Sequence, residues 1–273
     1  TCISYAAYLG PSFPVSPEID LPMPQAYIDQ PRYKNLLSSR SFQLLFMASV
    51  FSLLLTCARI WHTDSLRYIF LVWNLFLAAI PWLISRFLRT RAESDKADNK
   101  AIAWALRLTW LIFLPNAPYI ITDLYHIRYA SGSLLWYDVL LILTYAWTGL
   151  LFGLISIRDM EVDLRKTIGS VQTKVLIPVI LFLCSFGIYI GRFQRWNSWD
   201  LLTEPQHLMT DVLDLLLNPM THPRAWGVTL LMGIFLNLIY WSLSALRPES
   251  ATSKSELFNA QTLESDALIR SDD

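Results

Sequence analysis

Residues 134–157 read LLWYDVLLILTYAWTGLLFGLISI, a run in which Asp138 is the one charged residue. An α-helix rises about 1.5 Å per residue, so about 20 apolar residues cross a hydrocarbon core of about 30 Å. Trp136 and Tyr137 lie near the first end of the run, as is typical of segments that pass through a membrane interface. This stretch therefore predicts a membrane-spanning helix.

Further runs of the same character follow one another along the chain, and each is bounded by charged residues. The predicted spans are residues 41–58, 68–85, 101–122, 134–157, 175–191 and 225–246. The composition agrees, since 54% of the 273 residues are hydrophobic and the charges gather between these runs. We expect an all-α fold, a polytopic integral membrane helix bundle of about six transmembrane helices.

The segments on either side of these spans have a different composition. Residues 1–40 are rich in proline and show no helical period, and residues 247–273 are acidic. Both compositions are typical of a chain that cannot bury enough apolar surface to fold. The predicted domains are a disordered proline-rich head (1–40), a transmembrane helical domain (41–246) and a disordered acidic tail (247–273).

Lysine and arginine residues outside the spans are divided unequally between the two sides of the predicted bundle. The side that carries both termini and the connections 86–100 and 158–174 receives most of them. Because basic residues accumulate in cytoplasmic loops, this side is predicted to be the cytoplasm. The expected location is the cell (inner) membrane, with a multi-pass topology and both termini cytoplasmic.

The third predicted span contains two prolines three residues apart, Pro115 and Pro118. Proline lacks an N–H and its ring clashes with the preceding turn, so a straight helix cannot continue through this sequence. Broken helices survive in a membrane where protein or a water-filled cavity covers the freed carbonyl groups. The break either lines a binding site or is a kink at the membrane surface, about 10 Å from the outer end of the span by helical rise.

Several polar side chains lie at a similar depth in the predicted spans. Asn74, Asn116 and Asp138 lie within about 10 Å of the less basic side by helical rise, and Arg192 closes the fifth span. Polar groups at membrane depth are costly and tend to face a partner inside the bundle. These residues are either four independent features or parts of one site. Because Asp138 and Arg192 lie on consecutive spans, we expect them to form an ion pair or to hold one polar ligand jointly between the helices.

Residues 191–200 interleave two arginines and two tryptophans with an aspartate. Guanidinium groups beside indole faces favour the phosphate or sugar phosphate of a lipid headgroup, and the alternative is an interfacial aromatic belt with arginines that reach the surface. The candidate binding residues are Asn74, Asn116, Asp138, Arg192, Arg195, Trp196, Asn197 and Asp200. No catalytic residue is identified, so whether the protein is an enzyme stays open.

Residues 203–218 have the spacing of an amphipathic helix that lies on the membrane surface, with Thr203 as its N-cap. His207, Asp211 and Asp214 recur on the face opposite its apolar stripe. Such a row is either a solvated face or a metal site, and we predict no metal and no cofactor.

Two small-residue patterns, Gly149-x-x-x-Gly153 and Gly187-x-x-x-Gly191, allow helices to approach closely and are interpreted as structural.

Several motifs taken together resemble a known family. They are Trp73-Asn74-Leu75-Phe76-Leu77-Ala78, Phe113-Leu114-Pro115-Asn116-Ala117-Pro118-Tyr119-Ile120, Asp123-Leu124, Trp136-Tyr137-Asp138, and Gly191-Arg192 through Trp196-Asn197-Ser198-Trp199-Asp200. The chain resembles, over roughly residues 50–245, the bacterial membrane proteins of domain-of-unknown-function family 1361. The resemblance implies a multi-span membrane architecture, and it supplies no activity and no catalytic residues.

Three classes of function remain open. A scaffold or assembly factor for membrane proteins needs only close helix faces and an exposed aromatic loop, and this is our first expectation. The alternative is an enzyme or binder that acts on a lipid-linked or periplasmic anionic substrate. A transporter ranks third, because it needs polar groups through the whole membrane depth. The expected partners are the lipid bilayer, a lipid headgroup or other membrane proteins, and nucleic acid is excluded because the patch is extracytoplasmic and not broadly basic.

Overall fold

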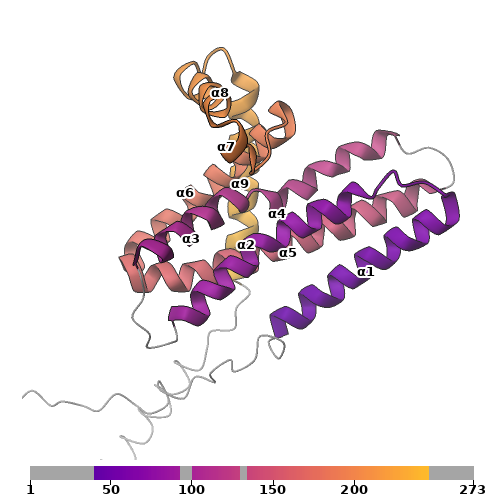
Figure 1. Ribbon diagram of the computed structural model, residues 1–273, viewed down its shortest axis with the longest axis horizontal. Helices are drawn as coiled ribbons and strands as arrows, with labels where there is room; N and C mark the ends of the chain where they lie inside the picture. Colours follow the sequence, from indigo (N-terminus) through magenta and orange to yellow (C-terminus); the bar gives the residue numbers. More distant parts are fainter. Residues whose placement is uncertain (1–39, 93–99, 130–133, 246–273) are drawn as a thin grey trace, which may run out of the picture. The chain divides into compact units, whose positions relative to one another are not determined.

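The computed structural model describes residues 40–92, 100–129 and 134–245, so the predicted disordered head and tail lie outside the described residues. In chain order the elements are α1 (Arg40–Thr63), α2 (Phe70–Ala92), α3 (Lys100–Phe113), α4 (Asn116–Tyr119), the 3-10 helix η3 (Ile120–Tyr129), α5 (Leu135–Ile168), α6 (Ser170–Tyr189), the π-helix η5 (Ile190–Gln194), α7 (Asp200–Thr203), α8 (Pro205–Leu217) and α9 (Pro223–Ala245) (Figure 1). The described part of the chain contains no strand, and the predicted all-α bundle is confirmed.

Five helices in the described ranges are long and apolar enough to cross a membrane: α1, α2, α5, α6 with η5, and α9. The chain is therefore a multi-pass membrane protein. The third predicted span does not form one helix, because it is divided into α3, α4 and η3 at the position of the prolines. The predicted break is thus present, and the segment continues to Tyr129, past the predicted end at residue 122.

Helix α5 is the longest element, with 34 residues. At about 1.5 Å per residue it is about 51 Å long, which exceeds a hydrocarbon core of about 30 Å. It continues past the predicted boundary at residue 157 because Arg158 to Lys166 are mostly residues that favour helix. It ends at Gly169, whose φ of 97° is a conformation that L side chains rarely adopt.

The helices pack around α5. Helix α2 lies along it, α1 packs against the same helix, and α6 pairs with both α5 and α9 (Figure 1). One buried apolar cluster surrounds Trp110 and Met160 between α3, α5 and α6, and another surrounds Tyr145 between α1, α2 and α5. These clusters fix the positions of α3, α5 and α6, and the polar groups described below lie on α2, α4, η3, η5 and the turn that follows η5.

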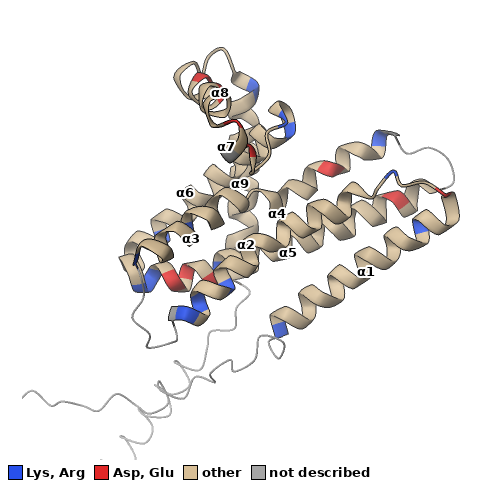
Figure 2. Ribbon diagram, in the orientation of Figure 1, with Lys and Arg blue, Asp and Glu red and all other residues tan. Residues whose placement is uncertain are grey.

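Charged side chains gather where α2 and α5 end and α3 begins, a region that we call the basic end (Figure 2). Three carboxylates of α5 accept hydrogen bonds here from other helices, namely Asp159 from Arg89, Glu161 from Tyr240 and Asp163 from Arg107. The carboxylates are buried, and each has a partner, as burial of a charge requires. This network ties α2, α3 and α9 to α5, and the sequence patterns did not predict it.

The predicted amphipathic helix is present as α8, but its predicted N-cap is wrong. The helix begins at Pro205, the cap position is Glu204, and neither Glu204 nor Thr203 makes a side-chain cap bond to it. Thr203 instead ends the short helix α7, because Asp200 to Thr203 already form a helical turn before Pro205.

Candidate functional site

The break in the third segment is the starting point of the site. Helix α3 ends at Phe113, and the Pro115 nitrogen has no hydrogen to donate back to the preceding turn. The Nδ2 of Asn116 donates to the Phe113 carbonyl at 3.0 Å, and the Ser198 Oγ lies 3.4 Å from the Ile112 carbonyl that accepts its proton. Side chains thus satisfy carbonyl groups that a continuous helix would have used internally, as membrane depth requires.

The short helix α4 is held between α5 and α6 by glycines. A Cβ added at Gly149 would lie 2.6 Å from the Ala117 carbonyl oxygen, and one added at Gly187 would lie 2.6 Å from Pro115 Cγ. Any larger residue at either position would push α4 away. The two glycine patterns are therefore used inside the chain, against the broken segment, and this agrees with their structural interpretation.

A cavity of about 280 Å³ opens beside the break, between the start of α2, α4, the end of α6, and α8. Its polar and aromatic lining consists of three side-chain amides, one serine and three aromatic side chains, and the remainder is apolar. The polar and aromatic lining residues are Trp73, Asn74, Asn116, Tyr119, Trp196, Asn197 and Ser198. The apolar and small lining residues are Leu77, Ile112, Pro115, Gly187, Ile190, Gly191, Leu201, Leu208 and Val212.

A buried ion pair lies behind the cavity wall. Asp123, which is 1% exposed, accepts hydrogen bonds from Asn74 Nδ2 at 2.8 Å and from Arg192 Nη1 at 3.0 Å. The guanidinium carbon of Arg192 also lies 5.8 Å from the ring centroid of Tyr119. The charge of Arg192 is therefore compensated within the protein. The amide of Asn74, which lines the cavity, is oriented by its bond to Asp123.

The chain after α6 folds back to complete the cavity. The π-helix η5 ends at Gln194, and the next residue, Arg195, caps it with a left-handed φ of 64°. The Trp196 backbone N–H then donates back to the Ile190 carbonyl at 3.4 Å. The Asp200 carboxylate accepts the backbone N–H of Asn197 at 2.6 Å and so fixes the following turn. This reversal brings Trp196, Asn197 and Ser198 onto the broken helix, where Asn116 donates to Ser198 Oγ at 2.9 Å.

The candidate residues from the sequence divide into three groups. Four of them line the cavity: Asn74, Asn116, Trp196 and Asn197. Arg192 and Asp200 hold neighbouring groups in place, and Arg195 is exposed just before Trp196.

Asp138 does not belong to this assembly. Its carboxylate binds Arg59 of α1 through Nε at 2.6 Å and Nη2 at 3.2 Å, and it accepts the Tyr68 hydroxyl at 2.9 Å. The predicted pair between Asp138 and Arg192 is therefore wrong. Asp138 pairs with Arg59 of α1, whereas Arg192 pairs with Asp123 of η3, so the two charges belong to different ion pairs.

The polar row of α8 has partners other than a metal. Asp211 accepts the indole N–H of Trp196 at 2.9 Å, and His207 lies 3.5 Å from Glu204. The described ranges contain no group of three or more His, Cys, Asp or Glu residues placed to hold a metal ion.

Asp214 of α8 contacts two residues of the connection between α8 and α9. It accepts hydrogen bonds from Asn218 at 2.7 Å and pairs with His222 at 2.8 Å, and these contacts lower the pKa of its carboxyl. A carboxylate held in this way connects the end of α8 to the start of α9.

The cavity has the chemistry of a binding site. Ser198 carries the aliphatic hydroxyl among the lining side chains, and its proton is directed at the Ile112 carbonyl, not at a base. Nucleophilic catalysis needs a base within hydrogen-bond distance of the nucleophile. Amides and aromatic faces around an apolar floor are instead suited to orient a small ligand.

Residues that the sequence reasoning did not include in the site are Asp123, Ser198, Trp73 and Tyr119. Asp123 lies on η3, and its place in the motif Asp123-Leu124 and its spacing of three from His126 were the signals that could have marked it. The tyrosine and the tryptophan lie next to chosen asparagines or prolines, so a wider window around each motif would have found them.

One known protein family matches this chain over the range that contains the cavity. The family model described as "Protein of unknown function (DUF1361)" matches residues 73–239, which is more than half of the chain, so the chain belongs to this family. No curated protein and no solved structure matches it. The matched range contains every residue that lines the cavity, whereas Arg59 and Tyr68, the partners of Asp138, lie before it.

Proposed function

We propose that this member of the DUF1361 family is a membrane-embedded binding protein whose cavity takes an uncharged polyol or sugar portion of the headgroup of an amphiphile. The observation that carries this proposal is the cavity beside the broken third segment, which combines three side-chain amides with an apolar floor. Their amide nitrogens donate within the protein, and an amide oxygen accepts from a hydroxyl group, so these amides suit a polyol or a sugar.

The aromatic lining supports the same ligand class. Trp73, Tyr119 and Trp196 offer flat faces with one polar atom each, a combination that contacts both the C–H face and the hydroxyl edge of a polyol. A volume of about 280 Å³ lies at the lower end of the range of small-molecule sites, so it suits one headgroup. Leu208 and Val212 of α8 close the cavity and give the apolar part of an amphiphile a surface to follow.

The proposal includes an orientation in the cell membrane of a bacterium. The basic end carries the charged network of α2, α3 and α5, so we assign it to the cytoplasm together with both termini (Figure 2). The cavity lies where α2 begins and α6 ends, so it would open toward the extracytoplasmic side. An amphiphile in the outer leaflet would then reach it without crossing the membrane.

A scaffold role is the second candidate function. It relied on glycine faces that a partner helix could approach, but Gly149, Gly153 and Gly187 are covered by the chain's own broken segment. A transporter ranks third, because the α5 carboxylates at the basic end are engaged in ion pairs and hydrogen bonds between helices. The binding role is the one that uses the cavity.

The test is to fill the cavity without changing the fold. Val212→Trp puts an indole into the space that Val212 lines, and Leu213→Trp makes the same addition at the adjacent exposed position of α8. We expect lipid-resolved mass spectrometry of the gently extracted wild-type protein to find an amphiphile enriched over the bulk membrane. Val212→Trp should lose it and Leu213→Trp should keep it. Equal lipid content in both variants would refute the proposal.

A further inference from the structure

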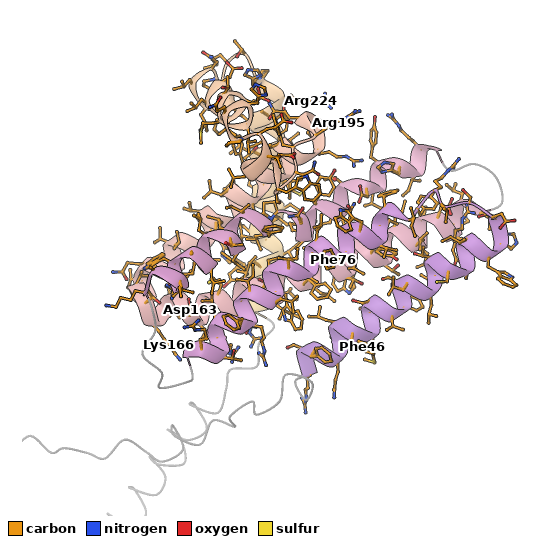
Figure 3. The ribbon with its side chains drawn as sticks, viewed as in Figure 1. Phe46, Phe76, Asp163, Lys166, Arg195 and Arg224 are labelled. Atoms are coloured by element: carbon orange, nitrogen blue, oxygen red, sulfur yellow. The ribbon has the colours of Figure 1, made fainter. Side chains whose placement is uncertain are left out.

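Two exposed arginines lie on or against the chain segment that leads into the cavity wall, and the binding role proposed above does not use them. Arg195 directly precedes Trp196 and Asn197, which line the cavity. The guanidinium carbon of Arg224, in the first turn of α9, lies 4.4 Å from the ring centroid of Phe193, two positions before Arg195. Figure 3 labels both arginines beside the end of α6. Arg195 thus belongs to the turn that ends η5, and Arg224 of α9 contacts the same segment through the Phe193 ring.

The backbone at Arg195 is in a conformation that its side chain does not favour. Its φ is 64° and its ψ is 26°, and its amide bonds back to the Ile190 carbonyl, which is the geometry of a helix C-cap. Glycine is the usual residue at such a position, because an added Cβ is strained there. Strained residues persist where the surrounding structure holds them, and they concentrate at functional sites. The backbone conformation does not favour an arginine at position 195, so we attribute the arginine to a role of its guanidinium group.

The charges around the two arginines are already engaged with other groups. Arg192 is paired with Asp123, Asp200 accepts from Asn197, and Asp211 accepts from Trp196. Within residues 40–92, 100–129 and 134–245, neither Arg195 nor Arg224 forms an ion pair, and both side chains are exposed. Two uncompensated guanidiniums beside a neutral polar cavity are a setting that attracts an anion.

We propose that Arg195 and Arg224 form an anion subsite at the edge of the cavity, so that the ligand carries a phosphate joined to an uncharged polyol headgroup. This inference rests on the proposed function, since the cavity must hold the polyol. The phosphate can belong to a lipid or to a free phosphate ester. We assign it to a lipid, because the cavity opens beside the apolar side chains of α8 and is part of a membrane protein.

The experiment uses the full chain in mild detergent and native mass spectrometry with two probe lipids of identical acyl chains. Phosphatidylglycerol carries a phosphate and a glycerol, and glucosyl diacylglycerol carries an uncharged sugar. Free sn-glycerol 3-phosphate competes in a third arm. We expect the wild type to bind both lipids. Arg195→Gly and Arg224→Gln should each weaken phosphatidylglycerol by about tenfold, the factor for one charge-assisted hydrogen bond, and leave glucosyl diacylglycerol unchanged.

The controls separate this inference from the function on which it rests. Arg67→Gln removes an exposed charge in the connection between α1 and α2, and it should leave both affinities unchanged. Arg195→Gly also relieves the backbone strain, so its folding should not suffer. If Arg195→Gly leaves phosphatidylglycerol binding intact or weakens both lipids equally, the anion subsite is overturned. If Val212→Trp fails to weaken glucosyl diacylglycerol, the cavity function itself fails. Competition by glycerol phosphate as strong as that of the lipid would overturn the lipid assignment.

Discussion

Replacing Asp123 with asparagine tests the buried ion pair on which the cavity wall depends. The carboxylate is 1% exposed and lies 3.0 Å from Arg192, whose side chain is 16% exposed. Asp123→Asn removes the negative charge and leaves Arg192 buried without its partner. Breaking a buried pair by removal of one charge costs about 3–5 kcal/mol. The hydrogen bond from Asn74 loses its charged acceptor as well, so we expect the upper part of that range.

A double-mutant cycle measures the pairing directly. Asp123→Asn, Arg192→Gln and the double variant are unfolded thermally in mild detergent. For a domain of this size, 1 kcal/mol corresponds to about 2–4 °C in Tm. The double variant should lose clearly less than the sum of the single losses, with a coupling of about 2 kcal/mol, within the range measured for residues in contact.

Two further cycles act as controls in the same assay. Asp138 and Arg59 should couple, because their contact has two hydrogen bonds. Asp138 and Arg192 have different partners, so their losses should add within about 0.5 kcal/mol. Additive losses for Asp123 with Arg192, together with coupling between Asp138 and Arg192, would contradict the pairing described above.

The remaining predictions concern the topology and the broken segment. Reporter fusions after Lys166 should report the cytoplasm and fusions after Arg128 or Asp200 the outer side, and a cytoplasmic signal at Asp200 would reverse the proposed orientation. Pro115→Ala should reduce the amphiphile that copurifies with the protein, because Pro115 lines the cavity and packs against Gly187; unchanged lipid content with higher stability would mean that the break is only a kink. Gly149→Ala should lower stability by about 1–3 kcal/mol through its clash with the Ala117 carbonyl, as overpacked cores do, whereas Gly227→Ala, where a Cβ meets nothing within 4 Å, should change little in the same unfolding assay.

The sequence predicted the architecture because the signals for it are local. Apolar runs of about 20 residues set the helices, and two prolines set the break, so both could be placed without knowing any contact. The depth of a residue along its own span is also local. Asn74, Asn116 and Arg192 could therefore be grouped by depth, and the structure brings Asn74 and Asn116 to one cavity and Arg192 behind its wall.

The pairing of charges could not be predicted in the same way, because it depends on the rotation of each helix about its axis. Asp138 and Arg192 lie on consecutive spans, but α5 turns Asp138 toward α1, where Arg59 lies. The partner of Arg192 comes instead from η3. The predicted third span ended at residue 122, which would have left Asp123 outside the bundle. Because η3 continues this segment to Tyr129, Asp123 is instead buried inside the bundle.

The length of η3 also changes the meaning of the proline break. By rise per residue, about 1.5 Å in α4 and about 2.0 Å in a 3-10 helix, the break lies about 26 Å along the segment from Tyr129. A surface kink would be close to the end of its segment and would leave its carbonyls to water. This break is far from the end, its carbonyls are bonded by Asn116 and Ser198, and glycines of α5 and α6 hold it on both sides. The same contacts that make the break tolerable place Asn116 and Ser198 at the cavity, so a substitution that healed the helix would remove the binding groups together with the break.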